Sequence, residues 1–187
     1  MSHINKEAMR KNPLAIDLFC GLGGWAEGLM AEGFDCIGFD IERHKYQGQT
    51  YPAQLVLQDV RTLDGRQFRN ADLIVASPPC QEFSRHDQPW TRALNPPSPD
   101  LSLVKAVYRI ASESGIPIIM ENVRGAQRWI GTAKARYGSQ YLWGDVPPLL
   151  PQPRKDARQK QSYASSARAL RAKIPFELAR HIGRVFA

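Results

Sequence analysis

LAIDLFCGLGGWAEGLMAEG, residues 14–33, is the stretch that decides how this chain folds. Residues 14–19 form a short apolar run that is typical of a buried strand. Three glycines follow within residues 21–24, and the pattern over 25–32 then predicts a helix that the glycine after it ends. A strand that turns through glycines into a helix is the opening unit of many α/β folds with a parallel sheet.

Further apolar runs repeat this alternation along the first two thirds of the chain. We expect strands at 35–39, 55–57, 73–76 and 116–120, helices at 43–51 and 102–114, and a strand-like segment at 140–143. Strands that alternate with helices at this spacing predict an α/β fold with a doubly wound, mainly parallel sheet. A length of 187 residues suits a single domain with one core. Such sheets place ligands at the carboxyl ends of their strands.

Two stretches break the alternation. Residues 84–99 contain four prolines and predict a long loop, and loops of that length in compact domains often carry function. Residues 149–166, rich in proline, glutamine and arginine, are expected to be irregular. Beyond them, residues 175–186 predict an amphipathic helix. The apolar side of that helix is expected to consist of Ile174, Leu178, Ile182 and Val185.

Charge is unevenly distributed along the chain. Residues 1–123 hold 12 Lys and Arg against 15 Asp and Glu, whereas residues 124–187 hold 13 against 3. A net charge of −3 therefore precedes a net charge of +10, and together they give the overall +7. A basic region of this kind predicts a surface that binds a polyanion such as nucleic acid, although a solvated basic surface would give the same counts.

Composition also indicates in which cellular compartment the protein acts and whether it binds a metal. No apolar run approaches the ~20 residues of a membrane span, and the polar, charged N-terminus does not predict a secretory signal. We therefore expect a cytoplasmic protein with no membrane partner. Three widely spaced cysteines and four scattered histidines form neither a disulfide framework nor a metal-ligand pattern, so no metal site is expected.

The glycine cluster predicts a cofactor site. Gly21, Gly23 and Gly24 allow a tight turn and a close approach of the backbone to a ligand. Asp40 ends the second expected strand, about 20 residues later, where an acidic side chain can bind ribose hydroxyls. Asp59, after the third strand, can reach an adenine amino group or simply cap its own loop. This pattern alone fits a nicotinamide dinucleotide as well as S-adenosylmethionine.

Cys80 lies on a stiff turn, in the run SPPCQEFS at residues 77–84, directly after the fourth expected strand. Two prolines fix the backbone there. A thiolate that adds to carbon 6 of a cytosine makes carbon 5 able to attack a methyl donor, provided that the base has left any helical stack. Glu121 ends the fifth strand. If strands four and five are neighbours, Glu121 opens into the same cleft, where burial would raise its pKa and let it donate a proton at ring nitrogen 3.

An amino-group methyltransferase is the sharpest rival interpretation of this turn. Such enzymes have a polar residue, two prolines and then an aromatic side chain that stacks on the base, whereas Cys80 takes the aromatic position here. A thiol cannot replace an aromatic ring in stacking, which disfavours the rival. The other two cysteines are expected to be structural, Cys36 as a buried hydrophobe within a strand and Cys20 as a packing residue beside the cofactor.

Taken in this order and at this spacing, these motifs resemble those of the cytosine carbon-5 DNA methyltransferases. DLFCGLGG (17–24), PPCQEFS (78–84) and ENV (121–123) look like the family's cofactor, nucleophile and Glu-Asn-Val motifs. The resemblance implies a Rossmann-like S-adenosylmethionine-dependent methyltransferase fold, with Cys80 as nucleophile and Glu121 at ring nitrogen 3 of a flipped cytosine. It implies cofactor contacts from Asp17, Phe19, Gly21, Gly23, Gly24, Asp40, Ile41, Asp59, Val60 and Pro78.

In its last third the chain departs from the family pattern. The family's Gln-x-Arg-x-Arg motif is missing, and Arg136 is the expected substitute that helps to hold the cytosine. Only residues 144–173 stand where the family has a target-recognition domain, too few for a second core. We expect an N-terminal extension at 1–12, a catalytic core at 13–143, this short basic segment, and a C-terminal helix at 174–187 that packs back on the core.

Seven residues are expected to contact nucleic acid. Some lie next to the nucleophile, one follows Glu121, and the others lie in the short basic segment. They are Gln81, Ser84, Arg85, Arg124, Arg154, Lys155 and Arg158. Basic side chains on phosphates give affinity without reading sequence. The sequence therefore predicts a DNA cytosine-5 methyltransferase with short or relaxed specificity, or with a protein partner that supplies specificity. The compact size of the chain suggests that it acts in a bacterial cell, as part of a phage, a mobile element or a restriction-modification system.

Two other functions stay open from the sequence. The first keeps the chemistry and changes the substrate to RNA, since one branch of the family methylates transfer RNA. The second is a catalytically silent nucleic-acid-binding subunit that retains the fold. The intact glycine loop, Cys80 and Glu121 argue against the silent subunit, because loss of function would leave no physical reason to keep all three.

Overall fold

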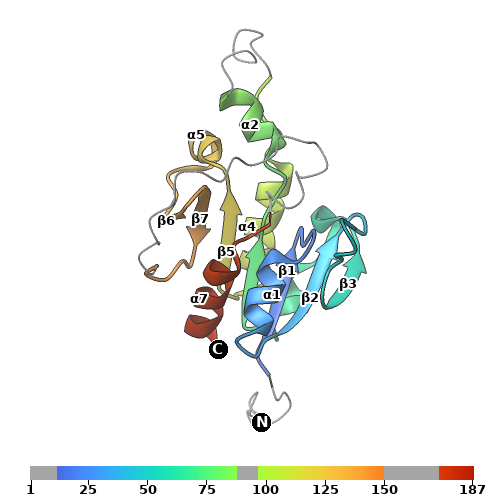
Figure 1. The fold of residues 1–187 in the computed structure, drawn as a ribbon. Coiled ribbons are helices and arrows are strands. Elements are labelled where there is room, and N and C mark those ends of the chain that lie inside the picture. Colours follow the sequence, from blue (N-terminus) through green and yellow to red (C-terminus); the bar gives the residue numbers. More distant parts are fainter. Residues whose placement is uncertain (1–11, 88–96, 150–172) are drawn as a thin grey trace, which may run out of the picture.

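The computed structural model describes residues 12–87, 97–149 and 173–187 of the chain, and its centre is a single sheet (Figure 1). The strands are β1 (Leu14–Leu18), β2 (Asp35–Asp40), β3 (Gln54–Leu57), β4 (Leu73–Ala76), β5 (Ile118–Asn122), β6 (Ala135–Tyr137) and β7 (Gln140–Gly144). Their order is β3-β2-β1-β4-β5-β7-β6, with the first five parallel and the last two antiparallel. The predicted doubly wound, mainly parallel α/β fold is confirmed.

Helices cover both faces of this sheet. They are α1 (Gly24–Met30), α2 (Gln81–Asp87), α4 (Ser102–Ser114), α5 (Gln127–Ile130) and α7 (Phe176–Phe186), with short 3-10 turns η2 (Val60–Thr62), η3 (Gly65–Phe68) and η4 (Arg124–Ala126). Because successive strand residues point to opposite faces, β1 divides its side chains between two cores. Ala15 packs with α1 and α7, whereas Ile16 and Leu18 pack with α4.

The C-terminal helix α7 packs directly on α1, beside β1 (Figure 1). The two helices approach closely because Gly28 has no side chain: a Cβ there would lie 2.4 Å from the Cβ of Ala179. Ion pairs border the contact, with Arg180 Nε 2.7 Å and Arg184 Nε 3.1 Å from Glu32 Oε1. Surface pairs of this kind contribute little each, so apolar burial and the close glycine contact hold the helix.

The expected helix at 43–51 was wrong. The backbone there forms a tight hairpin turn instead, in which Tyr46 and Gln49 exchange hydrogen bonds of 3.0 and 2.9 Å. Gln47 and Gly48 lie between them at φ values of 48° and 80°. Positive φ at both central residues defines a two-residue turn that a helix cannot contain, and Gly48 is what makes it accessible.

Three other boundaries differ from expectation. The loop predicted over 84–99 begins as helix, because α2 runs through Asp87 and buries Phe83, while the prolines come only after it. The fifth strand starts two residues later than predicted and includes Glu121. Val185 is 51% exposed and so does not belong to the buried side of α7, which instead contains Ala179 and Gly183 beside Leu178 and Ile182.

Residues 88–96 of the predicted loop and 150–172 of the basic segment lie outside the described ranges. Within those ranges, no helix has the length and the apolar character needed to cross a membrane.

The glycine contact between α1 and α7 predicts opposite effects for two matched substitutions. Gly28→Ala should destabilise the fold by about 1–3 kcal/mol, because the added methyl meets the Ala179 methyl and the Arg180 backbone nitrogen. Gly183→Ala, also in the helix pair, meets Glu32 Cβ at 3.1 Å, Glu32 Cγ at 3.2 Å and Leu29 Cδ2 at 3.5 Å. A shift of a few tenths of an ångström should accommodate it, so helix propensity should leave it neutral or stabilising. Urea unfolding followed by circular dichroism measures both. Equal midpoints for Gly28→Ala and the wild type would contradict the close packing.

Candidate active site

Cys80 occupies the turn between the end of β4 and the start of α2. Its side chain is partly exposed, and its carbonyl accepts the Ser84 backbone N–H at 2.9 Å, which starts the helix. The turn is tied to the next strand, because the side-chain amide of Asn122 donates to the Pro78 carbonyl at 2.9 Å.

Glu121 lies on the strand beside this turn. β4 and β5 pair in parallel, with Ala76 opposite Met120, so the neighbours predicted from sequence are neighbours in the sheet. Burial raises the pKa of Glu121 to about 7, although a hydrogen-bonding contact with the Ser77 hydroxyl offsets part of that rise. A carboxyl with this pKa holds a proton in a large share of molecules at neutral pH and can also release it.

A pocket of about 370 Å³ opens at the carboxyl ends of β1 and β2 and extends to the turn after β4. Ligand pockets commonly have this size. Its wall consists of Phe19, Gly21, Asp40, Ile41, Glu42, His44, Asp59, Val60, Arg61, Ser77, Pro79, Gln81, Asp100 and Leu103. Six of the predicted cofactor residues are therefore brought together: Phe19, Gly21, Asp40, Ile41, Asp59 and Val60.

The Asp40 carboxylate is fixed in the pocket by backbone donors. Its Oδ2 accepts the Gly21 N–H at 3.0 Å, and its Oδ1 accepts the Ile41 N–H at 2.8 Å. His44 Nε2 stands 3.4 Å from Oδ1. Gly21 adopts φ 51° with nothing near the position of a Cβ, so its role is conformational. These contacts orient a carboxylate whose remaining lone pairs can accept hydroxyl hydrogens.

The other predicted residues of the glycine motif serve the core. A Cβ on Gly23 would lie 2.3 Å from Pro52 Cδ, and one on Gly24 would lie 2.4 Å from the Ile174 backbone nitrogen. Asp17 is 1% exposed on β1, and burial raises its pKa well above the usual range. Gly23, Gly24 and Asp17 therefore shape the loop from behind the pocket.

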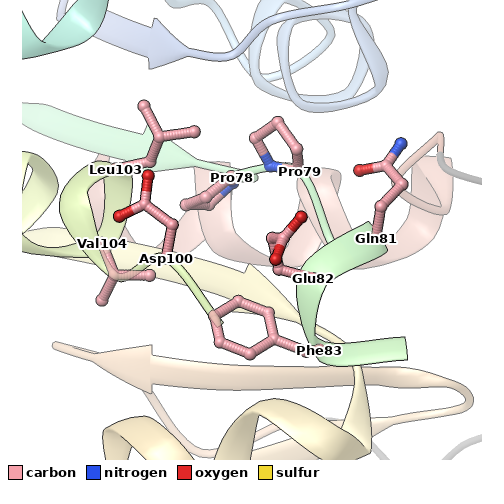
Figure 2. A pocket seen from close by; sticks show the side chains of 8 residues that line it. All are labelled: Pro78, Pro79, Gln81, Glu82, Phe83, Asp100, Leu103 and Val104. Atoms are coloured by element: carbon pink, nitrogen blue, oxygen red, sulfur yellow. The ribbon is translucent and has the colours of Figure 1, made fainter. Parts of the chain in front are cut away.

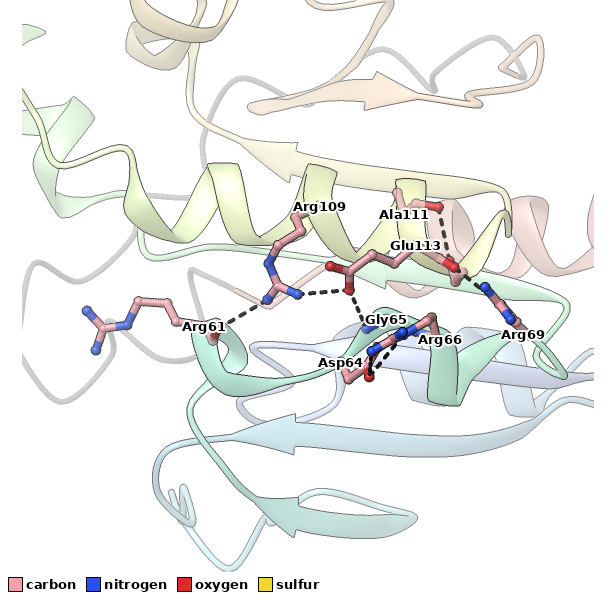
Figure 3. A network of polar contacts seen from close by, with 9 residues as sticks. Arg61, Asp64, Gly65, Arg66, Arg69, Arg109, Ala111 and Glu113 are labelled. Carbon is pink, nitrogen blue, oxygen red and sulfur yellow. Dashed lines mark hydrogen bonds and ion pairs between the residues drawn. The ribbon is translucent and has the colours of Figure 1, made fainter.

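Asp59 is held by Arg61, whose guanidinium binds the Asp59 carboxylate, with Nη2 2.6 Å from Oδ2. This contact lowers the pKa of the Asp59 carboxyl. The loop that carries this pair is anchored to α4, as Figure 3 shows. The Glu113 carboxylate accepts the Gly65 N–H at 2.7 Å and pairs with Arg109 at 2.9 Å. Arg109 also donates to the Arg61 carbonyl at 3.1 Å. The far wall of the pocket is thereby fixed to a helix.

A second pocket of about 270 Å³ adjoins the first (Figure 2). The two share Pro79, Gln81, Asp100 and Leu103. Pro78, predicted at the cofactor, lies in the wall of this smaller pocket. In the parts of the chain that the structure describes, no group of three or more His, Cys, Asp or Glu side chains is arranged to hold a metal ion.

The residues predicted to contact nucleic acid divide into three groups. Gln81, Ser84 and Arg85 lie on α2, where Arg85 stands 3.7 Å from Glu82. Exposed Arg124 lies on η4, which packs against α2. The remaining three, Arg154, Lys155 and Arg158, lie outside the described residues.

Arg136, the expected substitute for the family's cytosine-holding arginine, lies on the edge strand β6. Its Nε donates to the Gly138 carbonyl at 2.7 Å, and its guanidinium stands 5.5 Å from the ring centre of Tyr141. β7 separates β6 from β5, the strand that carries Glu121. The structure thus places Arg136 beside the sheet edge, two strands from Glu121.

Sequence reasoning missed several residues of the pocket wall. His44 and Arg61 lie within a few residues of predicted acidic positions, but no spacing rule marks them. Asp100 and Leu103 come from the start of α4, which only the fold brings to this edge of the sheet. Ser77 could have been found, because it is the last residue before the two prolines and directly follows β4, the strand that leads into the nucleophile turn.

Comparisons with known proteins find distant relatives of part of the chain. Type II methyltransferase M.DdeI of Desulfomicrobium norvegicum is 35% identical over 78 residues, 37% of this chain and 19% of that protein. Type II methylase M.HgiDII of Herpetosiphon aurantiacus is 32% identical over 81 residues, 38% of this chain and 23% of that protein. The matched part thus spans less than a quarter of either relative's length.

Among solved structures, the Entamoeba histolytica methyltransferase EhMeth is similar with a TM-score of 0.46 and 19% identity, over 65% of this chain and 41% of that one. A family model described as C-5 cytosine-specific DNA methylase matches residues 14–129, which is more than half of the chain and includes both strand-end motifs. With its glycine loop, its cysteine turn and its half-buried glutamate inside that match, the chain belongs to the C-5 cytosine-specific DNA methylase family.

Proposed function

We propose that this chain transfers a methyl group from S-adenosylmethionine to carbon 5 of a cytosine in DNA through a covalent adduct with Cys80. The observation that carries the proposal is the parallel pairing of β4 with β5, which sets the cysteine turn beside a half-buried glutamate with a pKa of about 7. The bond between Asn122 and the Pro78 carbonyl locks these two elements together. The membership of the family supports the reaction class.

The larger pocket fits S-adenosylmethionine. Asp40, fixed by two backbone donors, offers acceptor oxygens for ribose hydroxyls. Val60 and Leu103 supply apolar surface for the adenine, and Phe19 lines the same wall. Asp59 is the candidate for the adenine amino group, held in place by Arg61. When bound, the cofactor supplies an electrophilic methyl group.

The chain's own residues account for the remaining chemistry. The Cys80 thiolate adds its sulfur to carbon 6 of the cytosine, and Glu121 donates its proton toward ring nitrogen 3, which takes up the electron pair of the ring. Carbon 5 then gains the methyl group. Loss of the carbon-5 proton to a base and release of the Cys80 sulfur restore the aromatic ring and the free thiol. Glu121 recovers its proton as ring nitrogen 3 gives it up.

DNA is the proposed substrate, with a short or relaxed sequence preference. The basic residues 124–187 supply phosphate contacts, which give affinity without base reading. Only 30 residues, 144–173, stand where a target-recognition domain would be, and that number cannot build a second core. Selection of a longer site would then need a protein partner.

Covalent trapping tests the nucleophile. A duplex that contains 5-fluorocytosine should form a denaturation-resistant adduct with the protein when S-adenosylmethionine is present, because fluorine at carbon 5 blocks release of the sulfur. Cys80→Ala should abolish the adduct. Cys36→Ala, which removes a buried thiol in β2, should keep it. An RNA of the same sequence runs in parallel. If the wild-type protein forms no adduct with either nucleic acid, the proposal is wrong. If it forms an adduct with RNA alone, the substrate is RNA and not DNA.

The half-buried glutamate predicts a pH dependence. Because the reaction needs protonated Glu121, the single-turnover methylation rate should fall as pH rises through about 7. Glu121→Gln cannot donate a proton and should lose roughly 10²–10⁴-fold in rate. What rate remains should lack the alkaline limb near pH 7. An alkaline limb that survives unchanged in Glu121→Gln would assign it to another group.

Bisulfite sequencing of DNA from expressing cells tests the specificity. Methylated cytosines should share a context of only a few bases or none, because 30 residues offer few base contacts beyond the catalytic core. Purified protein on naked DNA should give the same context. Methylation confined to one long motif in both experiments is the result that would overturn this expectation.

A further inference from the structure

We propose that Ser77 is a positioning residue for Glu121 and that the indole N–H of Trp25 holds the Ser77 hydroxyl in this role. The inference rests on the proposed function and deepens it, because it names how the proton-donating carboxyl is aimed and tuned. Ser77 is the first residue of the cysteine turn and Trp25 lies in α1, so neither is the nucleophile or part of the Glu-Asn-Val segment.

Sheet register puts Ser77 next to Glu121. The parallel ladder between β4 and β5 ends with Ala76 opposite Met120. Ser77 directly follows Ala76 just beyond the end of β4, and Glu121 is the next residue of β5. The Ser77 backbone N–H continues the ladder on the other side by donating to the Leu18 carbonyl at 3.2 Å. Because paired residues of parallel strands point to the same face, the hydroxyl and the carboxyl meet side by side.

A hydrogen bond from Trp25 determines what the Ser77 hydroxyl can do. Trp25 Nε1 stands 3.0 Å from Ser77 Oγ, and an indole nitrogen can only donate. The serine oxygen therefore accepts from Trp25. Its single hydrogen is left to donate elsewhere, and the Glu121 carboxyl is the acceptor beside it. Trp25 is only 2% exposed and sits in the first turn of α1, so this donor is held by the core.

The contact has a defined electrostatic sense. A hydroxyl that donates to a carboxylate stabilises the charged form, and it opposes the burial that raises the pKa of Glu121. After Glu121 passes its proton toward ring nitrogen 3, the new carboxylate is half-buried and gains the Ser77 hydrogen bond at that moment. Ser77 thus favours release of the proton, while burial favours holding it.

The same three residues join the cofactor loop to the catalytic carboxyl. Trp25 directly follows the glycine loop, and Ser77 lines the cofactor pocket. A shift of α1 would therefore change the donor to Ser77 and, through it, the orientation of Glu121.

Titration of Glu121 in the cofactor-free protein tests the inference. Carboxyl ¹³C resonances of glutamate-labelled protein give the pKa directly, with the Glu121 signal assigned by its loss in Glu121→Gln. Ser77→Ala should raise the pKa of Glu121 by about one pH unit, the size expected for a lost hydrogen bond to a charged group. Ser77→Thr retains the hydroxyl and should restore the wild-type value. Trp25→Phe should raise the pKa by a smaller amount.

A matched control and an activity readout complete the test. Ser114→Ala removes another buried serine hydroxyl, which donates to the Ala111 carbonyl in α4, and should leave the Glu121 titration unchanged. In single-turnover methylation the alkaline limb of Ser77→Ala should move up by the same amount as its titration. A Glu121 pKa that is equal in wild type and Ser77→Ala would overturn the inference, as would equal shifts in Ser77→Ala and Ser77→Thr. The titration needs neither cofactor nor DNA, so failure of the trapping experiment leaves its result independent.

Discussion

Asn122 and the Pro78 carbonyl make the hydrogen bond on which the catalytic edge of the sheet depends. Two consecutive prolines supply no N–H, and they leave a buried carbonyl that must find a donor. The Asn122 amide provides that donor at 2.9 Å, while its oxygen accepts the Val123 N–H at 2.9 Å. Asn122 is 1% exposed, so loss of the bond would leave an unpaired polar group in the core. The cysteine turn and the Glu-Asn-Val segment are therefore one structural unit, although 40 residues lie between them in sequence.

A hydrogen bond between a loop and a strand end also shapes the larger pocket, at the carboxyl ends of β1 and β2. Gly21 turns its N–H to Asp40, and this bond fixes both the loop and the carboxylate. Gly23 and Gly24 are needed because Pro52 and Ile174 approach them too closely for a side chain. The glycines of this motif thus meet two requirements. Gly21 and Gly23 give the loop its left-handed conformation, at φ 51° and 81°, whereas Gly23 and Gly24 let other elements pack on it.

Periodicity was enough to predict the parts that bury continuous apolar surface. The helix at 102–114 and the strand at 73–76 were predicted with their observed bounds, because every turn of the first and every residue of the second contributes to the core. Cys80 and Glu121 could be found since their strands end at the same edge. The hairpin turn at Gln47 was missed because a single glycine decided it against the surrounding helix-forming residues. Arg61 and Leu103 join the pocket through tertiary packing, which no local pattern reports.

Chemistry and target selection are separable in this architecture, and the reason lies in α7. The cysteine turn, Glu121 and the cofactor pocket all precede residue 124, and the last helix is needed only to cover α1 and one face of the sheet. Gly28 and the Glu32 ion pairs attach it to α1, and His181 adds a contact with the Pro148 carbonyl at 2.8 Å, shortly after β7. The entropy of closing a loop grows slowly, by about 0.6 kcal/mol for each doubling of length. A segment of 30 residues or of several times that number can therefore bridge β7 and α7 at nearly equal cost to the core.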